Sequence, residues 1–374
     1  MKTAVVAGAI AGKQGNGGEA WVRLSWIRAF ERLGFRVYFA EQVETPTAGQ
    51  IAYFSEIVDD FGLTGRACLI DPTTGKTTGM ALEEMRDAAG SAEFLVNISG
   101  NLGYPPVFDR FGLRIYVDLD PGFTQYWHRQ GLLGEGLERH HIHLTVGSNV
   151  GGAQCPIPTG GIRWRPIRQP VVLEDWPFMP SPSLGRMTTI GSLRGPFGPV
   201  TDNGAVLGLK IHEMRKFAGM ASEVDPVLEL AMHIDPADER DRLLLEEGGW
   251  RLVAPGKVAG DPGRFREYIQ GSDGEFSVAQ GIYVDTASGW FSDRSVRYLA
   301  SGKPVLVQDT GVGENLPVGD GLLVFSDERE AKAGLAKIAD RYQEHCRAAR
   351  AIAEDFFEAG RVAGDVLVAA GGGH

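Results

Sequence analysis

Residues 289–313 read GWFSDRSVRYLASGKPVLVQDTGVG, and this stretch decides how the rest of the chain is interpreted. A polar turn gives way to a helical pattern that ends at Gly302, and the short apolar run PVLVQ follows as a strand buried on both faces. Ser292 or Asp293 caps the predicted helix and leaves backbone N–H groups at its positive end, where a phosphate can bind. Ordinary helix caps without a ligand explain the same residues, so this stretch alone leaves both interpretations open.

Length and composition describe a chain of more than one domain. It has 374 residues, of which 43% are apolar and 23% charged, as in soluble globular proteins. The sequence contains no run of about 18 apolar residues. Its start, MKTAVVAGAIAGKQGNGG, reads as a first strand and a glycine loop rather than a signal peptide. We therefore expect a cytoplasmic protein of two domains.

Charge and cysteine content argue against several classes of function. The net charge is −11 without a basic cluster, which disfavours a broad nucleic-acid surface but permits a local positive pocket for a small anion. Cys68, Cys155 and Cys346 are widely spaced and fit neither a disulfide framework nor a zinc site. We expect no metal, no nucleic-acid partner and no membrane span.

The first half of the chain alternates predicted strands and helices. TAVVAGAI is followed by a glycine loop, a helix over about 19–33 and the strand FRVYFAEQV. Further strands are predicted at RACLID, EFLVNIS, GLRIYVDLD and HHIHLTVGS. Apolar strands separated by helices predict an open parallel sheet, whose ligands bind at the carboxyl ends of the strands.

The first glycine loop, GNGGEAW, lies at such a strand end. Asn16 followed by Glu19 resembles a capping box. Alternatively, Gly15, Gly17 and Gly18 let a ligand or another backbone come close. The spacing differs from the dinucleotide fingerprint GxGxxG, so we do not expect NAD to bind.

The stretch DLDPGFTQYWH also follows a predicted strand. Alternation points Asp118 and Asp120 to one face before Pro121 forces a turn. Such a carboxylate pair binds a metal, shares a proton or caps the following turn, and capping is the commonest use. His128 is the other acid-base candidate, although a lone histidine is more often structural.

A composition change divides the chain. From GGAQCPIPTGG to EDWPFMPSPS the sequence is rich in Pro, Gly and Trp, which predicts an interdomain region with a boundary near Asp175. We expect domains at 1–174 and 175–374. Strands and helices then resume at RMTTIGSLRG and repeat the architecture of the first half. A break at Ala359 and Gly360 would let the last helical segment cross back to the first domain.

Three of these motifs together resemble the GT-B glycosyltransferases, in which two Rossmann-like domains face each other across a cleft. GNGGEAW is similar to the glycine loop that opens the acceptor domain, and GSLRG to the loop that starts the donor domain. SVRYLASGKPVLVQDTG is similar to the signature near the ribose and phosphates of the donor, and it is the most specific of the three. The resemblance covers most of the chain.

The chain departs from this family at two places. Many retaining members carry two glutamates eight positions apart, and here Gly289 and Arg297 occupy those positions. The first glycine loop also lacks the histidine that many inverting members use as a base. The resemblance therefore implies neither stereochemical outcome.

The resemblance implies transfer of a sugar from a nucleotide diphosphate sugar to a small-molecule or glycan acceptor, without a cofactor and without a metal. The implied donor and phosphate-binding residues are Arg194, Ser292, Asp293, Arg294, Ser295, Asp309, Thr310, Gly311 and Glu314. Arginine suits this role because its fork matches phosphate geometry. The implied base is Asp120, with His128 and Glu19 as the other candidates, and the acceptor-side loop comprises Gly15, Asn16, Gly17 and Gly18 together with Asp118.

Two rival functions stay open from the sequence. One is a nucleotide-sugar epimerase or hydrolase on the same fold, and the other is a non-catalytic sugar- or nucleotide-binding homologue, which the missing glutamates favour. Aromatic segments around Trp127, Trp164 and Trp176 either line an acceptor cleft or pack at the domain junction.

Overall fold

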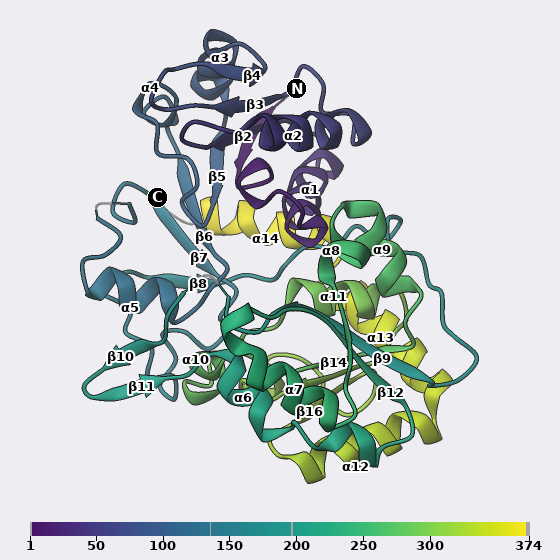
Figure 1. Cartoon of the computed structure of the whole chain (residues 1–374). Helices are drawn as coiled ribbons and strands as arrows, with labels where there is room; N and C mark the ends of the chain where they lie inside the picture. The colour runs from purple at the N-terminus through teal and green to yellow at the C-terminus, as the bar shows by residue number, and fades with distance from the viewer. Residues whose placement is uncertain (1, 135, 196, 372–374) are drawn as a thin grey trace.

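Two sheets with helices packed against them organise the structure, a computed structural model that describes residues 2–134, 136–195 and 197–371. Figure 1 shows the N-terminal sheet above the C-terminal one. Among the described residues, none of the helices combines the length and apolar character needed to cross a membrane.

The N-terminal sheet has eight strands in the order β4-β3-β2-β1-β5-β6-β7-β8. Neighbouring strands are parallel except at the edge pair β3 and β4. Its strands are β1 (Thr3–Ala7), β2 (Arg36–Gln42), β3 (Ala67–Ile70), β4 (Thr77–Gly79), β5 (Phe94–Ile98), β6 (Arg114–Asp118), β7 (Ile142–Thr145) and β8 (Trp164–Pro166).

The C-terminal sheet has six strands in the order β13-β12-β9-β14-β15-β16, and all its neighbouring pairs are parallel. Its strands are β9 (Arg186–Ser192), β12 (Val227–His233), β13 (Arg251–Val253), β14 (Gly274–Ser277), β15 (Val305–Gln308) and β16 (Leu322–Phe325).

Both sheets contain the doubly wound strand order, which runs 3-2-1-4-5-6 when strands are counted along the chain. The order reverses between β1 and β5 in the first sheet and between β9 and β14 in the second. This confirms the prediction of two Rossmann-like domains. The limits 1–174 and 175–374 stay a prediction, and the two sheets are consistent with them, since β8 ends before that boundary and β9 begins after it.

The helices alternate with the strands, as the sequence predicts. In the N-terminal half they are α1 (Gly17–Arg32), α2 (Ala48–Asp60), α3 (Leu82–Ser91), α4 (Pro105–Phe108) and α5 (Phe123–Arg129). In the C-terminal half they are α6 (Lys210–Lys216), α7 (Glu239–Glu247), α8 (Pro255–Ala259), α9 (Pro262–Gln270), α10 (Gly281–Asp285), α11 (Asp293–Ala300), α12 (Glu328–Asp340), α13 (Tyr342–Phe356) and α14 (Ala359–Gly371). Short 3-10 turns are η1 (Ala11–Lys13), η2 (Met220–Glu223), η3 (Pro236–Asp238) and η4 (Val312–Glu314).

Strand β1 illustrates why the apolar runs become central strands. Ala4 and Val6 pack into the core that includes Phe30 of α1, whereas Val5 and Ala7 pack into a separate core on the other face of the sheet. All four strand residues are fully buried. A strand covered on both faces needs a continuous apolar run, because neither face meets water.

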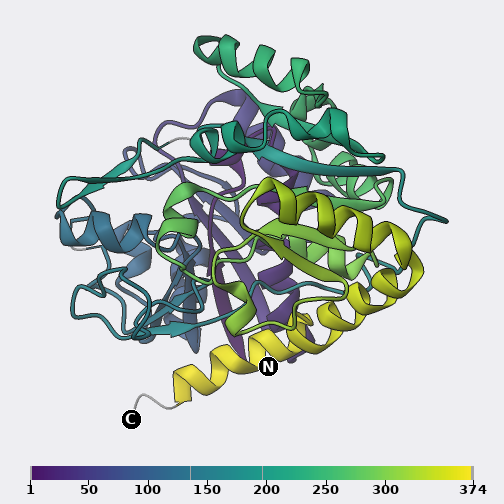
Figure 2. The same ribbon diagram turned by 90° about the horizontal axis from the view of Figure 1, so that it is seen from below.

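The C-terminal helix crosses back to the first domain, as expected from the break in the helical pattern. Helix α13 packs against α11, and α14 then packs against α1. Figure 2 shows α14 from below as the yellow helix that leads to the C-terminus. Backbone hydrogen bonds hold the crossing point: Val171 N–H donates to Phe357 O (2.8 Å), and Ala359 N–H donates to Val171 O (3.0 Å).

A hairpin that the sequence analysis did not predict joins the domains at another point. Strands β10 (Val200–Asp202) and β11 (Ala205–Leu207) form it between β9 and α6. It reaches α5 of the N-terminal domain, where Asp202 pairs with Arg129 and the Phe197 ring packs edge-on against Trp127 at 4.6 Å. The hairpin therefore links the two domains beside the cleft.

The start of α1 packs directly on the C-terminal domain. A Cβ atom at Gly17 would lie 2.1 Å from the Asp261 carbonyl oxygen, and one at Gly18 would lie 2.7 Å from the Phe265 ring. The indole N–H of Trp21 donates to Pro262 O across the same contact (2.8 Å). At Gly17 the close neighbour is thus another backbone.

We expect Gly17→Ala to destabilise the protein, because the new Cβ collides with rigid backbone rather than with a flexible side chain. Overpacking of this kind costs about 1–3 kcal/mol, and each kcal/mol lowers the melting temperature of a domain this size by roughly 2–4 °C. The control is Gly90→Ala in α3, where a Cβ atom meets open space. Equal melting temperatures for Gly17→Ala and the control would contradict this account of the interface.

Candidate active site

A cavity of about 780 Å³ separates the two domains at the carboxyl ends of their strands. The N-terminal wall comes from the segments after β1, β5 and β6, and includes Lys13, Ser99 and Asp120. The opposite wall comes from the ends of β9 and β12 and the start of α11, and includes Gly191, His233 and Arg294. Both reversal points of strand order border this cleft, which is where doubly wound sheets bind ligands.

The first glycine loop lies in the N-terminal wall, as predicted. Gly15, Asn16, Gly18 and Glu19 line the cleft. Asn16 caps α1, since its Oδ1 accepts the Glu19 N–H at 3.3 Å. Only this half of the predicted capping box forms, because the Glu19 carboxylate turns to Arg23 instead.

Glu41, near the end of β2, holds the backbone between β1 and the first glycine loop in place. Its carboxylate is fully buried and accepts the backbone N–H groups of Ile10, Ala11 and Gly12 at 2.7–2.9 Å. Three hydrogen bonds to one carboxylate fix the chain as it leaves β1. No sequence pattern pointed to Glu41, because its partners are backbone groups about thirty residues earlier.

The two carboxylates of DLDP have different environments. Asp118 is completely buried and accepts hydrogen bonds from Thr124 Oγ1 (2.6 Å), Gln125 Nε2 (2.8 Å) and Thr145 Oγ1 (2.7 Å). It also accepts the Asp120 N–H at 3.0 Å. Asp118 therefore holds the turn, which is the capping use that the sequence left open, and it does not face the cleft.

Asp120 is half-buried and lines the cleft. Burial raises the pKa of its carboxyl to about 6, and the nearby charges of Asp118 and Glu19 act in the same direction. The Tyr283 hydroxyl of α10 donates to Asp120 Oδ1 at 3.1 Å, which opposes the shift and orients the carboxylate. A carboxylate with this pKa is suited to accept a proton near neutral pH.

Glu19 has the opposite electrostatic setting. Burial alone would raise the pKa of its carboxyl, but Arg23, Lys13 and Arg297 outweigh that effect, so the pKa lies below its ordinary value. Its ion pair with Arg23 occupies the carboxylate. Glu19 is therefore a weaker base than Asp120, although both lie in the same wall.

His128 is at the end of α5 and is not among the residues that line the cleft. Its Nδ1 lies 3.6 Å from a Glu138 carboxylate oxygen, and its ring packs against Gly160. The structure thus brings Asp120 and Glu19 together and leaves His128 apart from them.

Helix α11 presents its first turn to the cleft, as the opening motif predicts. Ser292 is the N-cap, and its hydroxyl accepts the Arg294 N–H at 3.2 Å. Asp293 and Arg294 line the cleft. Ser295 is buried behind them, on a small separate cavity that Ser292 and Thr310 also line.

Arg294 is anchored beneath the cleft surface. Its Nε donates to the fully buried Glu275 carboxylate of β14 at 2.5 Å, and its terminal nitrogens donate to Ile190 O (2.6 Å) and Ser277 Oγ (2.7 Å). These bonds fix the guanidinium, paired with Glu275, at the reversal point of the second sheet. Arg294 is a structural residue as well as a lining residue.

Lys210, at the start of α6, adds a second cation that the site prediction did not include. A Cβ atom at Gly191 would lie 3.9 Å from Lys210 Nζ and 4.0 Å from an Arg294 terminal nitrogen. Burial lowers the pKa of Lys210 to about 7, and the Arg294 charge adds to the effect. In the sequence Lys210 appears only as the first basic residue of a short helix. Its proximity to Arg294 is therefore visible only in the folded structure.

Arg194 points elsewhere. It is exposed and forms a two-pronged ion pair with Asp238, with nitrogen to oxygen distances of 2.5 and 2.6 Å. It does not contribute to the cavity wall described above. Lys210 does not line the cavity either, but its Nζ lies close to Gly191, which does.

The second glycine loop after β15 contacts the N-terminal domain rather than the cleft wall. Thr310 Oγ1 donates to Trp290 O (2.6 Å), and Asp309 Oδ1 accepts the Gly311 N–H (2.8 Å). The Asn149 amide of the N-terminal domain donates to Gly311 O at 3.1 Å. Glu314 is exposed in η4 and does not line the cleft.

Gly289 and Arg297, which occupy the positions of the two family glutamates, make other contacts in this structure. Gly289 has a φ of +71°, and a Cβ atom there would lie 2.2 Å from Ser148 Oγ. Arg297 is buried and pairs with Asp293 of the same helix at 2.8 Å. A glutamate at position 289 would therefore require a rearranged domain contact.

The sequence left open whether the tryptophans line an acceptor cleft or pack at the domain junction, and the structure shows examples of both. Trp176 is fully buried and packs edge-on against Trp21 at 5.2 Å, and Trp164 packs on Tyr116. Trp127 is partly exposed beside Phe197. Trp290, which was not singled out, lines the cleft.

In the described part of the chain, no cluster of three or more His, Cys, Asp or Glu side chains is arranged to hold an ion.

Comparisons with known proteins identify the fold. No protein-family model matches the sequence, and no curated protein does either. Among solved structures, an alpha-glucosyltransferase in complex with UDP is similar with a TM-score of 0.62, 7% identity and 98% of both chains covered. Sucrose-phosphate synthase from Thermosynechococcus elongatus has a TM-score of 0.59 and 13% identity, over 98% of this chain and 97% of that one. Anabaena HepE in complex with UDP has a TM-score of 0.57 and 14% identity over all of both chains. The chain therefore has the fold of the GT-B glycosyltransferases, which its motifs resemble.

Proposed function

We propose that the protein is a glycosyltransferase that moves a sugar, of the hexose type, from a nucleotide diphosphate sugar to an acceptor. One observation supports this most directly. The cleft sets Asp120, a carboxylate with a raised pKa, opposite Arg294 and the first turn of α11, and buried Lys210 lies behind Gly191 of the same wall. Such a transfer needs a base on one side and charge stabilisation of a leaving diphosphate on the other.

On the donor side, the cations and the helix start would bind the diphosphate. Breaking the bond to the sugar leaves growing negative charge on the phosphates, and preorganised cations stabilise that charge without a covalent intermediate. Arg294 is held in place by Glu275, so it needs no reorganisation when the ligand arrives. Gly191 keeps the space above Lys210 and Arg294 free of a side chain.

On the acceptor side, Asp120 would take the proton of the attacking hydroxyl. Trp290 lines the same cleft and stacks on Tyr283, which itself holds Asp120. A flat aromatic surface beside a base is suited to a sugar or another ring-shaped acceptor. Cysteines that are all free agree with a cytoplasmic location for this reaction.

The first test is a panel of nucleotide sugars, beginning with UDP-glucose because two of the similar structures contain UDP. With a set of sugar and phenolic acceptors in EDTA, we expect transfer that requires an added acceptor and no divalent ion. Turnover without acceptor would identify an epimerase or hydrolase, and a thermal shift without turnover would identify a binding protein. Strict dependence on Mg²⁺ or Mn²⁺ would reject the metal-free mechanism.

The second test concerns the base. We expect kcat/KM to fall as the pH drops below about 6, because Asp120 must be ionised to accept a proton. Asp120→Asn should lower kcat by roughly 10²–10⁴-fold while nucleotide binding persists. Glu19→Gln is the matched control from the same wall and should cost much less. A larger loss in the control would transfer the role to Glu19.

The third test concerns Lys210. Its pKa of about 7 in the free protein means that the side chain must take up a proton to meet the diphosphate at higher pH. The affinity for UDP-glucose, measured by calorimetry, should therefore weaken as the pH rises from 7 to 8.5, and Lys210→Gln should flatten this dependence. Uridine, which lacks phosphates, is the control ligand. The same slope for uridine or for Lys210→Gln would refute the assignment.

A further inference from the structure

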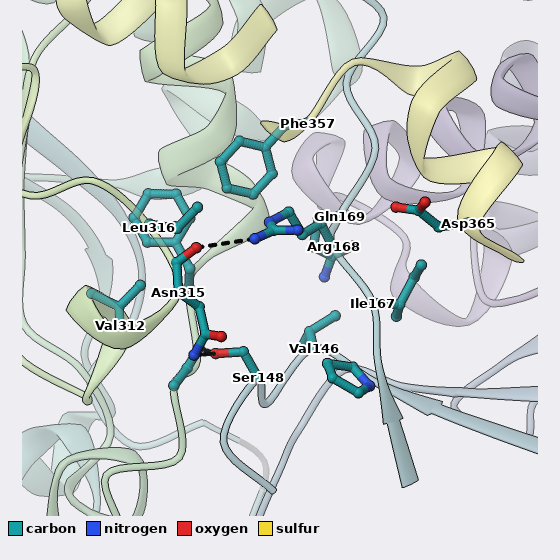
Figure 3. A pocket seen from close by; sticks show the side chains of 13 residues that line it. Val146, Ser148, Ile167, Arg168, Gln169, Val312, Asn315, Leu316, Phe357 and Asp365 are labelled. Atoms are coloured by element: carbon teal, nitrogen blue, oxygen red, sulfur yellow. Dashed lines mark hydrogen bonds between the residues drawn. The ribbon is translucent and has the colours of Figure 1, made fainter. Parts of the chain in front are cut away.

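A second cavity, of about 190 Å³, lies at the junction of the two domains and the C-terminal segment (Figure 3). Val146 and Ser148 come from the loop after β7, Val312 and Leu316 from the segment after β15, and Phe357 from the turn before α14. Figure 3 shows these side chains around a common space. Neither domain alone forms this cavity.

This cavity borders the cleft without being part of it. Gly289 and Phe291 line it, whereas Trp290 between them lines the cleft. Gln169 lines both, is 6% exposed, and has no side-chain hydrogen bond within the described part of the protein. The same segment, 289–291, leads directly into the cap of α11.

Arg168 supplies the only arginine or lysine side chain in this wall among the described residues. One terminal nitrogen donates to Asn315 O at 3.0 Å, a contact drawn in Figure 3, and the guanidinium lies over the Phe356 ring at 5.2 Å. Within the described ranges it has no ion-pair partner at 4 Å or closer. Burial lowers the pKa of Arg168, and the charge of Asp365 opposes that shift from the cavity wall.

We propose that this cavity is a second ligand site, for a small molecule that carries one carboxylate on a flat apolar body. The remaining N–H groups of Arg168 match a carboxylate, and the rings of Phe291 and Phe357, which stack at 5.5 Å, border the space for the apolar part. A cavity of about 150 Å³ can hold benzene, so this one has room for a ring and a carboxylate. Asp365 disfavours a second negative charge on the ligand.

Because its walls come from both domains, a bound molecule would stabilise their relative arrangement. It would also contact the segment that positions Trp290 and α11. This site is independent of the proposed glycosyl transfer, since none of its polar side chains except Gln169 lines the cleft.

Benzoate is the probe, and benzyl alcohol is its uncharged match. By calorimetry with the full chain, we expect saturable benzoate binding that is at least tenfold tighter than that of benzyl alcohol. Arg168→Gln should weaken benzoate binding at least tenfold and leave benzyl alcohol binding unchanged. Arg163→Gln, which alters an exposed arginine outside the cavity, is the matched control and should bind benzoate like the unmodified protein.

A second variant keeps the test decisive if Arg168→Gln alters folding. Leu316→Trp fills the cavity from the segment after β15 and should abolish binding of both probes, while saturating UDP-glucose in the cleft should not displace benzoate. Absence of saturable benzoate binding, equal affinity for the two probes, or benzoate binding unaffected by Leu316→Trp would each overturn the proposal. Failure of glycosyl transfer would leave these binding results unchanged, so the two proposals can fail separately.

Discussion

The guanidinium of Arg294 ties three elements of the C-terminal domain together at the point where its strand order reverses. It joins the first turn of α11 to Glu275 on β14 and to the carbonyl of Ile190 on β9. A buried charge must be paired and hydrogen-bonded to be tolerated, and removing one partner is strongly destabilising. The position of the helix start depends on this network, and the Arg294 charge adds to the burial that lowers the pKa of Lys210.

In the N-terminal wall of the cleft, two neighbouring aspartates have different surroundings. Asp118 has its oxygens occupied by four hydrogen bonds and fixes the turn, whereas Asp120 faces the cleft with a raised pKa. Two carboxylates of one motif therefore acquire different roles from their surroundings alone. The hydroxyl of Tyr283 then connects Asp120 to the other domain, so the orientation of the carboxylate depends on how the domains meet.

Contacts between the domains also explain why glycine occupies positions 17 and 289, which lie in stretches that the sequence associates with ligand binding. Gly17 allows the backbone of the C-terminal domain to approach, and Gly289 lies against Ser148 of the N-terminal domain. The hairpin β10–β11 was not predicted, because its strands are only three residues long and lie in a segment without a clear apolar period. It packs on α5 of the N-terminal domain, a contact that no local pattern encodes.

The sequence by itself determined the alternation of the main strands and helices, the repeat of one architecture in both halves and the return of the last helix, because apolar period, glycine ends and helix caps are local signals. It also located Asp120 at a strand end and a capped helix start at Ser292, and the family resemblance placed both beside a cleft. Only the tertiary structure separated Asp120 from His128, paired Arg194 with Asp238 away from the cleft, placed Lys210 near Arg294, and revealed Glu41 and the cavity around Arg168. Each of these depends on groups far apart in the chain, whose burial and charge are set by three-dimensional contact and not by spacing along the sequence.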